Sequence, residues 1–325
     1  MPLKVLILSR TSGAYSTQRL KQACVKRGHV PRVFNTLGFS LLLENRGLEL
    51  FYRGRLVSQY DAVIPRIGAS ISGFGSAVLR HLEQKGVFAL NSSQSIAASR
   101  DKLRALQILA GHELPIPATA FVRDRSSVKE AIAQVGGPPI IIKLIEGSQG
   151  VGVILADTAK TAEAILETLL IARQCVVVQK YISESRGTDL RALVVGQTVV
   201  AAMRRAAAPQ EFRTNVHRGG TVEKVRLTRE QERVAIDATQ TLGLRVAGVD
   251  LIESDEGPLV LEVNSSPGLE GIEAATGVDV ASSIVEHLEE QIQFPVFDVR
   301  QRLTRGGEHD LLELGIQPKS PWVGQ

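Results

Sequence analysis

Pairs of apolar runs joined by short glycine-bearing turns recur after residue 140, and they constrain the fold of this chain more than any other feature. The pairs are residues 140–144 with 151–155, 191–195 with 199–203, and 247–252 with 259–264. Such runs around a tight turn are typical of antiparallel hairpins. Capping boxes at 127–130 and 228–231 mark helices between them. We therefore expect a mixed α+β region here.

The first 95 residues follow a different pattern. Apolar runs lie at 4–8, 62–64 and 87–90, a helical stretch lies at 74–85, and a hairpin-like segment lies at 48–57. After the first run, Ser16 can cap a helix that Gly28 ends. Strands that alternate with helices predict a small parallel α/β lobe, with the hairpin as an addition to it.

Domain boundaries follow from breaks in these patterns. A helical pattern at 95–113 is stopped by the Leu-Pro-Ile-Pro sequence at 114–117. From Phe294 onward the apolar period is lost and glycines, prolines and arginines accumulate. The predicted organisation is an α/β domain at 1–95, a domain of two lobes at 96–292 that divides near residue 180, and a flexible C-terminal tail at 293–325.

Composition excludes several classes of protein. The chain has 325 residues, 44% of them hydrophobic, with a formal net charge of +4. Aromatic residues make up only 4% and do not interleave with basic clusters, which argues against a dedicated nucleic-acid module. No apolar run approaches the length of a membrane span or of a signal-peptide core, so we expect a cytoplasmic protein with no membrane partner.

The strongest local signal for chemistry lies in the last hairpin. If its turn falls near Glu256, Asp250 lies opposite Glu262, and the two-residue period of a strand places Asn264 on the same face. Facing carboxylates repel, so a bound cation is an economical reason for keeping them together. Ligation by oxygen alone suits magnesium or manganese, with positions left for phosphate oxygens. The alternative is a solvated acidic face of a hairpin.

A glycine-rich turn, EGSQGVG at 146–152, follows Lys143. Glycines let backbone N–H groups approach a phosphate, and a nearby lysine adds positive charge. Strands on both sides fit neither the Rossmann nor the Walker pattern, because both require a helix after the glycines. A plain hairpin turn with a surface lysine is the alternative. Similarly, Lys102 beside Arg100 and Asp101 can be read as a solvated charge run.

Basic residues crowd the segment before Gly220. They are Arg204, Arg205, Arg213, His217 and Arg218. A proline at 209 ends any helix early and leaves Arg213 in a loop, where an arginine suits recognition of phosphate or carboxylate. No serine or cysteine nucleophile accompanies the histidine, and no spacing of cysteines or histidines suggests zinc.

Taken in order, these segments resemble the ATP-grasp ligases, and within them most closely the RimK group. The resemblance runs from Lys4 to about Ile292 and is most specific at 64–68, 99–103, 143–147, 215–220 and 262–271. It implies an ATP-grasp fold of α/β and α+β class, preceded by a parallel α/β pre-ATP-grasp lobe.

The resemblance also implies roles for single residues. Lys102 and Lys143 would contact ATP phosphates, and Asp189 would bind the ribose. The adenine hinge would be Gln179, Lys180 and Tyr181, although relatives usually carry glutamate at the Lys180 position. Arg213, the implied catalytic residue, would lie with Thr214 and Asn215 at the transferred phosphate. Asp250, Glu262 and Asn264 would hold two Mg²⁺ ions, with Mn²⁺ as a substitute.

The activity implied by the resemblance is the ATP-dependent addition of L-glutamate to the C-terminal carboxylate of ribosomal protein S-six through an acylphosphate. Arg204, Arg205, Arg213 and Arg218 would then be available to an acceptor that stays acidic after each addition. The resemblance further implies a homo-oligomer, with a tetramer expected. The alternatives are an ATP-grasp ligase for a carrier protein or a coenzyme glutamate tail, and a non-catalytic nucleotide-binding regulator of ribosomes.

Overall fold

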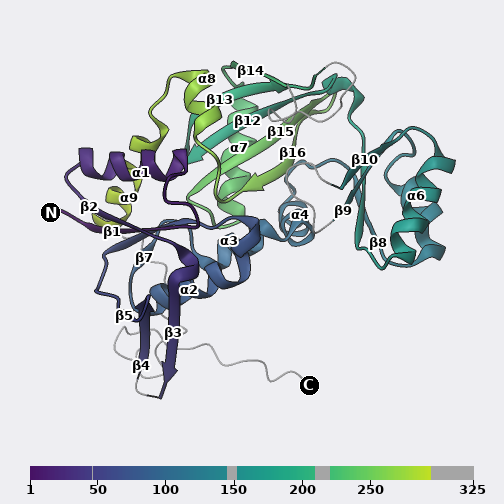
Figure 1. Cartoon of the computed structure of the whole chain (residues 1–325). Helices are drawn as coiled ribbons and strands as arrows, with labels where there is room; N and C mark the ends of the chain where they lie inside the picture. The colour runs from purple at the N-terminus through teal and green to yellow at the C-terminus, as the bar shows by residue number, and fades with distance from the viewer. Residues whose placement is uncertain (46, 145–151, 209–219, 294–325) are drawn as a thin grey trace, which may run out of the picture. The chain divides into compact units, whose positions relative to one another are not determined.

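The computed structural model describes residues 1–45, 47–144, 152–208 and 220–293. The chain forms two compact units, residues 1–287 and residues 288–325. Of the second unit, only the end of the last helix belongs to the described residues. Within the first unit, the described strands form four sheets (Figure 1). No helix in the described part is long and apolar enough to cross a membrane.

The N-terminal sheet is parallel, as the sequence predicts. Its order is β2-β1-β6-β7, and its strands are β1 Lys4–Ser9, β2 Val30–Phe34, β6 Ala62–Arg66 and β7 Phe88–Ala89. The helices of this region are α1 Tyr15–Lys26 and α2 Ser72–Gln84. Strand β1 is buried from Val5 to its end, which explains its continuous apolar run.

The predicted cap of α1 is wrong. The helix follows Ala14, which makes no side-chain cap, and Ser16 lies inside the first turn. The Ser16 hydroxyl instead accepts a hydrogen bond from the backbone N–H of Leu269, at 2.9 Å. A long-range contact has therefore taken the serine that local chemistry assigned to the helix end.

The hairpin expected at 48–57 is part of a three-stranded antiparallel sheet in the order β3-β4-β5. Its strands are β3 Phe39–Glu44, β4 Gly47–Tyr52 and β5 Arg55–Leu56. The sequence analysis missed β3. An aromatic cluster fastens this sheet to the parallel one, because the Phe34 ring of β2 lies 4.4 Å from the Tyr52 ring and 5.6 Å from the Phe39 ring, centroid to centroid.

The helical pattern at 95–113 forms two helices, α3 Ser93–Arg100 and α4 Lys102–Gly111. Asp101 separates them with an extended backbone, and its side chain accepts a hydrogen bond from the Arg104 N–H, at 3.0 Å. The aspartate thus caps a new helix. Lys102 consequently begins α4 and is not part of a continuous charged face.

The sheet in the middle of the chain is antiparallel, and its strand order is β10-β9-β11-β8. Its strands are β8 Thr119–Val122, β9 Ile140–Leu144, β10 Val153–Ala156 and β11 Val176–Lys180. Helices α5 Val128–Gln134 and α6 Ala159–Ile171 pack on it through a buried apolar cluster. The β9–β10 pair confirms the first predicted hairpin.

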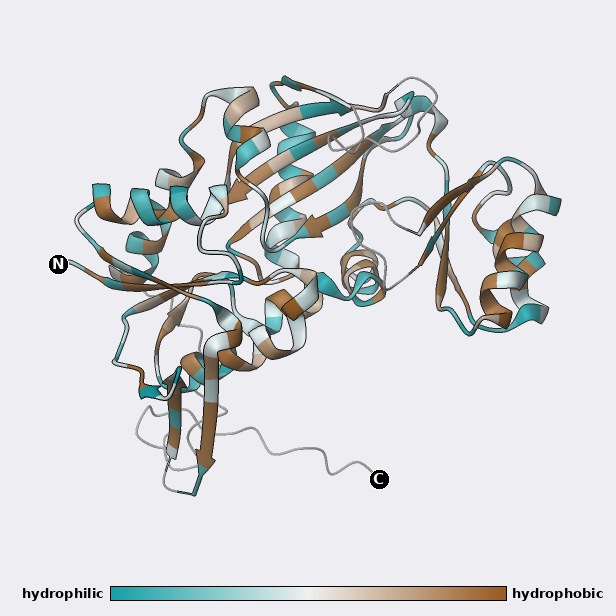
Figure 2. Cartoon of the chain, viewed as in Figure 1, coloured by the Kyte–Doolittle hydropathy of each residue, from teal (hydrophilic) through white to brown (hydrophobic). Residues whose placement is uncertain are grey.

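The five-stranded sheet is also antiparallel, and its strand order is β14-β13-β12-β15-β16. Its strands are β12 Thr188–Val195, β13 Thr198–Ala206, β14 Thr221–Lys224, β15 Val246–Ser254 and β16 Gly257–Asn264. Helix α7 Arg229–Thr241 covers one face, where residues of α4 join the core (Figure 1). Apolar residues run along these strands, and α7 carries both apolar and polar residues (Figure 2).

The remaining elements complete the chain. Helices α8 Glu270–Thr276 and α9 Val280–Gln293 follow β16. Short 3-10 turns lie at Thr36–Gly38, Ala69–Ile71, Arg125–Ser127 and Ser183–Ser185. The predicted tail at 293–325 lies outside the described residues from residue 294 on, so its predicted flexibility stays a prediction.

Candidate nucleotide and metal site

The β15–β16 hairpin has the register that the sequence predicts. Asp250 pairs with Glu262 and Gly248 pairs with Asn264, with an irregularity after Asp250 that leaves the spacing of these pairs intact. Strand periodicity therefore places the three oxygen-bearing side chains on one face. Asp250 is buried, Asn264 is half-buried and Glu262 is exposed.

Asp250 is held by two arginines from neighbouring strands. Arg191 donates from Nε to Oδ1 and from Nη2 to Oδ2, each at 2.7 Å, and Arg205 Nη2 lies 3.0 Å from Oδ2. Burial alone would raise the pKa of Asp250, but the charges of Arg191 and Arg205 outweigh it and hold the pKa at about 2. The carboxylate is therefore ionised and fixed in orientation.

Asp189 lies beside this group and is buried. Its two carboxylate oxygens accept hydrogen bonds from Arg205, from Nε at 2.6 Å and from Nη2 at 2.7 Å. In this structure the carboxylate therefore positions Arg205, and its implied contact with a ribose stays a prediction.

The donor set around Asp250 fits magnesium in its chemistry. Two carboxylates and one amide oxygen are hard ligands, and magnesium usually takes few carboxylates from a protein. Among the described residues, Arg191 alone donates a hydrogen bond to Asp250 Oδ1, which leaves this oxygen a lone pair for a metal. Asn264 Oδ1 accepts from the Ser266 N–H at 2.9 Å. No cluster of three or more acidic, histidine or cysteine side chains occurs in the described ranges, so Asn264 is needed to complete the set.

Lys143 lies on β9 and donates from Nζ to the side-chain oxygen of Gln179, at 2.6 Å. Gln179 is buried on β11 and in turn donates to Thr119 Oγ1, at 2.9 Å. Desolvation lowers the pKa of Lys143 to about 8; the charge of Glu262 opposes this shift, and the charge of Lys102 adds to it. The lysine is therefore positioned by the sheet and close enough to Glu262 to sense its charge.

Lys102 approaches the same place from α4. Its Nζ donates to the carbonyl oxygen of Leu144, at 3.2 Å, just beyond Lys143 in β9. Desolvation lowers the pKa of Lys102, while Glu262 raises it. Three separate segments thus bring Lys102, Lys143 and Glu262 into one electrostatic neighbourhood, as a nucleotide phosphate and metal site requires.

The predicted hinge follows β11. Gln179 is buried, Lys180 is exposed and Tyr181 is half-buried. The Lys180 backbone N–H donates to the Ala118 carbonyl, at 2.8 Å. The adenine contacts of these residues remain predictions.

Several predicted site residues lie outside the described ranges. They are Arg213, Thr214, Asn215, His217 and Arg218, together with residues 146–151 of the glycine-rich turn. Their predicted roles stay predictions.

The idea that Arg205 is available to an acidic acceptor is wrong, whereas the availability of Arg204 stays a prediction. Both lie on β13, where Arg204 pairs with Glu223 and Glu253 at 3.6 and 3.5 Å. Arg205 is buried and committed to Asp189 and Asp250. Sheet pairing sets acidic side chains next to both arginines, and the charge of Arg205 is neutralised within the fold.

Arg191 is the functional neighbour that sequence reasoning missed. It lies directly opposite Asp250 across the β12–β15 pairing, and Asp189 lies opposite Arg205 across the β12–β13 pairing. The signal was the two-residue spacing of Asp189 and Arg191 in an apolar strand, which places both on the face of Asp250.

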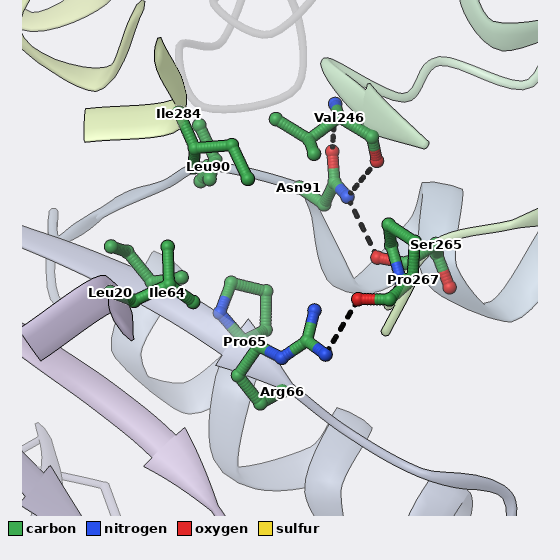
Figure 3. A pocket seen from close by; sticks show the side chains of 10 residues that line it. All are labelled: Leu20, Ile64, Pro65, Arg66, Leu90, Asn91, Val246, Ser265, Pro267 and Ile284. Carbon is green, nitrogen blue, oxygen red and sulfur yellow. Dashed lines mark hydrogen bonds between the residues drawn. The ribbon is translucent and has the colours of Figure 1, made fainter. Parts of the chain in front are cut away.

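The loop that follows Asn264 is tied to the N-terminal sheet (Figure 3). The buried Asn91 amide donates to the Val246 and Ser265 carbonyls, at 2.7 and 3.1 Å, and accepts from the Arg245 and Val246 N–H groups. Arg66 Nη2 donates to the Pro267 carbonyl, at 2.7 Å. The hollow between them has a volume of about 10 Å³, room for roughly one water molecule.

These features define the class of enzyme. An antiparallel sheet that carries Lys143, another antiparallel sheet whose hairpin carries Asp250, Glu262 and Asn264, and a preceding parallel α/β domain are the ATP-grasp arrangement of an ATP-dependent ligase. A RimK pre-ATP-grasp family model matches residues 3–96, and a RimK-like ATP-grasp family model matches residues 99–288. The chain belongs to the RimK-like ATP-grasp family.

Relatives and solved structures agree with this assignment. A probable alpha-L-glutamate ligase of Rhodopirellula baltica is 53% identical over 99% of this chain and 80% of its own length. One from Azotobacter vinelandii is 49% identical over 90% of this chain and 97% of its own length. The structure of the ATP-grasp ligase PsnB with a phosphomimetic variant of its minimal precursor, Mg and ADP is 25% identical, with a TM-score of 0.69 over 90% of this chain and 99% of that one.

Proposed function

We propose that this ligase adds L-glutamate to the C-terminal carboxylate of ribosomal protein S-six, at the expense of ATP. The observation that carries the proposal is the neighbourhood of Lys102, Lys143 and Glu262, next to Asp250 and Asn264 on the β15–β16 hairpin. Relatives named probable alpha-L-glutamate ligase support glutamate as the donor.

In the proposed reaction an oxygen of the acceptor carboxylate attacks the γ-phosphorus of ATP, and ADP leaves. The amino group of glutamate then attacks the acyl carbon of the acylphosphate, phosphate leaves, and the surplus amine proton passes to solvent. Negative charge grows on the transferred phosphate, so Lys102 and Lys143 would stabilise it electrostatically. Arg213, with Thr214 and Asn215, is proposed to act at the same phosphate.

Asp250, Glu262 and Asn264 are proposed to hold two Mg²⁺ ions, for which Mn²⁺ could substitute. When bound, these ions would neutralise phosphate oxygens and orient them. The PsnB complex with Mg and ADP supports this use of the fold. Within the protein, Arg191 and Arg205 would keep Asp250 ionised and oriented before the ions bind.

The acceptor distinguishes this proposal from its rivals. A carrier protein or a coenzyme glutamate tail would use the same nucleotide residues, while a non-catalytic ribosome regulator would not need the complete oxygen-ligand set. A cytoplasmic location and a homo-oligomeric, tetrameric state belong to the proposal and are testable by fractionation and by light scattering.

The test is intact-mass analysis of ribosomal protein S-six after incubation with enzyme, ATP, magnesium and L-glutamate. We expect mass steps of one glutamyl residue, since each addition regenerates a terminal carboxylate. Removing the last residues of the acceptor should abolish the steps. Extension of only a carrier side chain or a small coenzyme would refute this acceptor.

A further inference from the structure

Arg66 and Arg100 meet at the edge of the N-terminal sheet that faces the β15–β16 hairpin, which carries the proposed metal ligands. Arg66 ends strand β6, and Arg100 ends helix α3. Arg66 donates to the Pro267 carbonyl at 2.7 Å, and Arg100 donates to the carbonyl of Ile67, the residue after Arg66. Both guanidinium groups are therefore fixed at the carboxyl end of a parallel strand, where ligands of open α/β sheets usually bind.

The charge of Glu262 acts on Arg100, but ion pairs with described residues do not neutralise these two positive charges. In contrast to Arg191, Arg204 and Arg205, neither forms an ion pair with any residue in the described ranges. Desolvation, with the like charge of Arg100, lowers the pKa of Arg66 to about 10, and desolvation also lowers the pKa of Arg100. Keeping like charges together away from water is costly unless an anion joins them.

Unused hydrogen-bonding groups lie at the same corner. Within the described part of the chain, Arg100 Nε and the hydroxyl groups of Ser265 and Ser266 are buried without a partner. Buried polar groups of this kind are uncommon and call for a missing ligand or water. In Figure 3 the Arg66 guanidinium uses one terminal nitrogen for Pro267 and directs the other towards the hollow lined by Asn91 and Ser265.

The position of the corner limits what it can bind. The hollow beside Arg66 is too small for an amino acid, and the charge of Glu262 acts on Arg100 from the side of the β15–β16 hairpin. The acceptor carboxylate, which attacks ATP, must lie at the transferred phosphate and therefore near the lysines. A donor amino acid keeps its carboxylates ionised throughout the reaction, and these need positive charge that the phosphates do not use.

We propose that Arg66 and Arg100 form the binding site for a carboxylate of the free amino-acid donor and hold it beside the metal hairpin. The inference rests on the proposed ligase function and adds the residues that select an acidic donor. Planar guanidinium groups suit this role because they bind carboxylates through two parallel hydrogen bonds.

The test measures binding without turnover. L-Glutamate is titrated calorimetrically into the full chain loaded with Mg²⁺ and the non-hydrolysable analogue AMPPNP, for the wild type, Arg66→Met and Arg100→Met. We expect the dissociation constant for glutamate to rise about tenfold or more in both variants, with the affinity for AMPPNP unchanged within about twofold. Arg104→Met is the matched control, because Arg104 is an exposed arginine on the next helix.

Two further arms make each outcome decisive. Arg66→Lys and Arg100→Lys keep the positive charge but lose the two parallel N–H donors of the guanidinium group. They should therefore bind glutamate with intermediate affinity, and they provide a test even where a methionine variant fails to fold. L-Glutamine and the α-amide of L-glutamate each lack one carboxylate, and the weaker binder identifies which carboxylate is held.

Wild-type affinity for glutamate in the folded variants would overturn the inference, as would an equal loss of AMPPNP affinity, which would place the arginines at the phosphates. Failure of the wild type to bind any amino acid would also overturn it. If the wild type binds another acidic amino acid and needs both arginines to do so, the site stands and glutamate as the proposed donor is wrong.

Discussion

Among the described residues of the candidate site, Lys143 has the charge that is most sensitive to pH. Its pKa, lowered to about 8 by desolvation, means that the free enzyme loses this positive charge as the pH rises through 8. If ATP binding needs the charged form, kcat/KM for ATP should fall above pH 8 by about tenfold per pH unit. Measuring kcat/KM for ATP between pH 6.5 and 9.5 checks this.

The matched variant is Lys143→Arg, whose guanidinium stays charged across this range. Its absolute activity should be lower because the geometry at Gln179 changes. Its fall above pH 8 should disappear. A fall at the same pH in Lys143→Arg would show that another group causes it.

Glu262 is exposed and belongs to the proposed metal ligands, so its charge can be removed with little effect on folding. Glu262→Gln keeps the side-chain volume but loses the negative charge, and we expect turnover to fall by about a hundredfold or more. ADP release measured against magnesium concentration checks the change. Glu256→Gln, an exposed residue in the turn of the same hairpin, should behave as the wild type. ADP release near the wild-type rate in Glu262→Gln would contradict the metal assignment.

At the scale of single elements, two predicted capping boxes had different outcomes. Thr228 and Gln231 form a full capping box at the start of α7, with the Gln231 N–H 3.2 Å from the Thr228 hydroxyl. The same pattern at 127–130 is wrong as a prediction, because Ser127 makes no side-chain cap on α5. Asp124 instead accepts from the Ser126 N–H, at 2.9 Å, and starts a 3-10 turn that already contains Ser127.

This difference gives a paired prediction. Thr228→Ala should lower the free energy of unfolding by about 1 kcal/mol, the usual cost of a lost cap. Ser127→Ala should change it by less than about 0.5 kcal/mol, since no cap hydrogen bond is lost. Urea unfolding of both variants measures the two values. Equal losses would mean that the caps do not differ as described.

At the scale of the whole molecule, distant parts of the first unit are joined by polar contacts. Arg19 of α1 pairs with Glu273 and Asp279 at 2.9 and 2.7 Å, and Asn91 joins the ends of β15 and β16. The Arg19 pairs join α1 to α8 and to Asp279, and Asn91 holds the residue after the proposed metal ligand Asn264. The geometry around the hairpin therefore depends on residues far away in the sequence.

The C-terminal segment gives a second test at this scale. The RimK-like family model ends at residue 288, and residues from 294 on lack an apolar period. We predict that truncation before Arg300 leaves ligase activity nearly unchanged and the Tm within about 2 °C of the wild type. A calorimetric scan and an ADP-release assay check it. A larger drop in Tm would mean that the tail packs on the rest of the chain.

The sequence by itself determined the features that depend on neighbouring residues. Turn glycines and two-residue periodicity were enough to predict the hairpin that pairs Asp250 with Glu262, and alternation of strands and helices was enough for the parallel N-terminal lobe. Both are set by local backbone geometry, which a sequence carries directly. The ordered motifs added the ATP-grasp class.

Only the tertiary structure decided which charged groups form ion pairs within the protein and which do not. Arg191 and Arg205 both pair with Asp250 because strands from separate hairpins lie side by side, whereas Arg66 and Arg100 form no ion pair with a described residue. Ser16 likewise lost its capping role to a loop more than 250 residues away. Charge pairing acts between atoms in space over a few ångströms, so it is settled only once the fold has brought those atoms together.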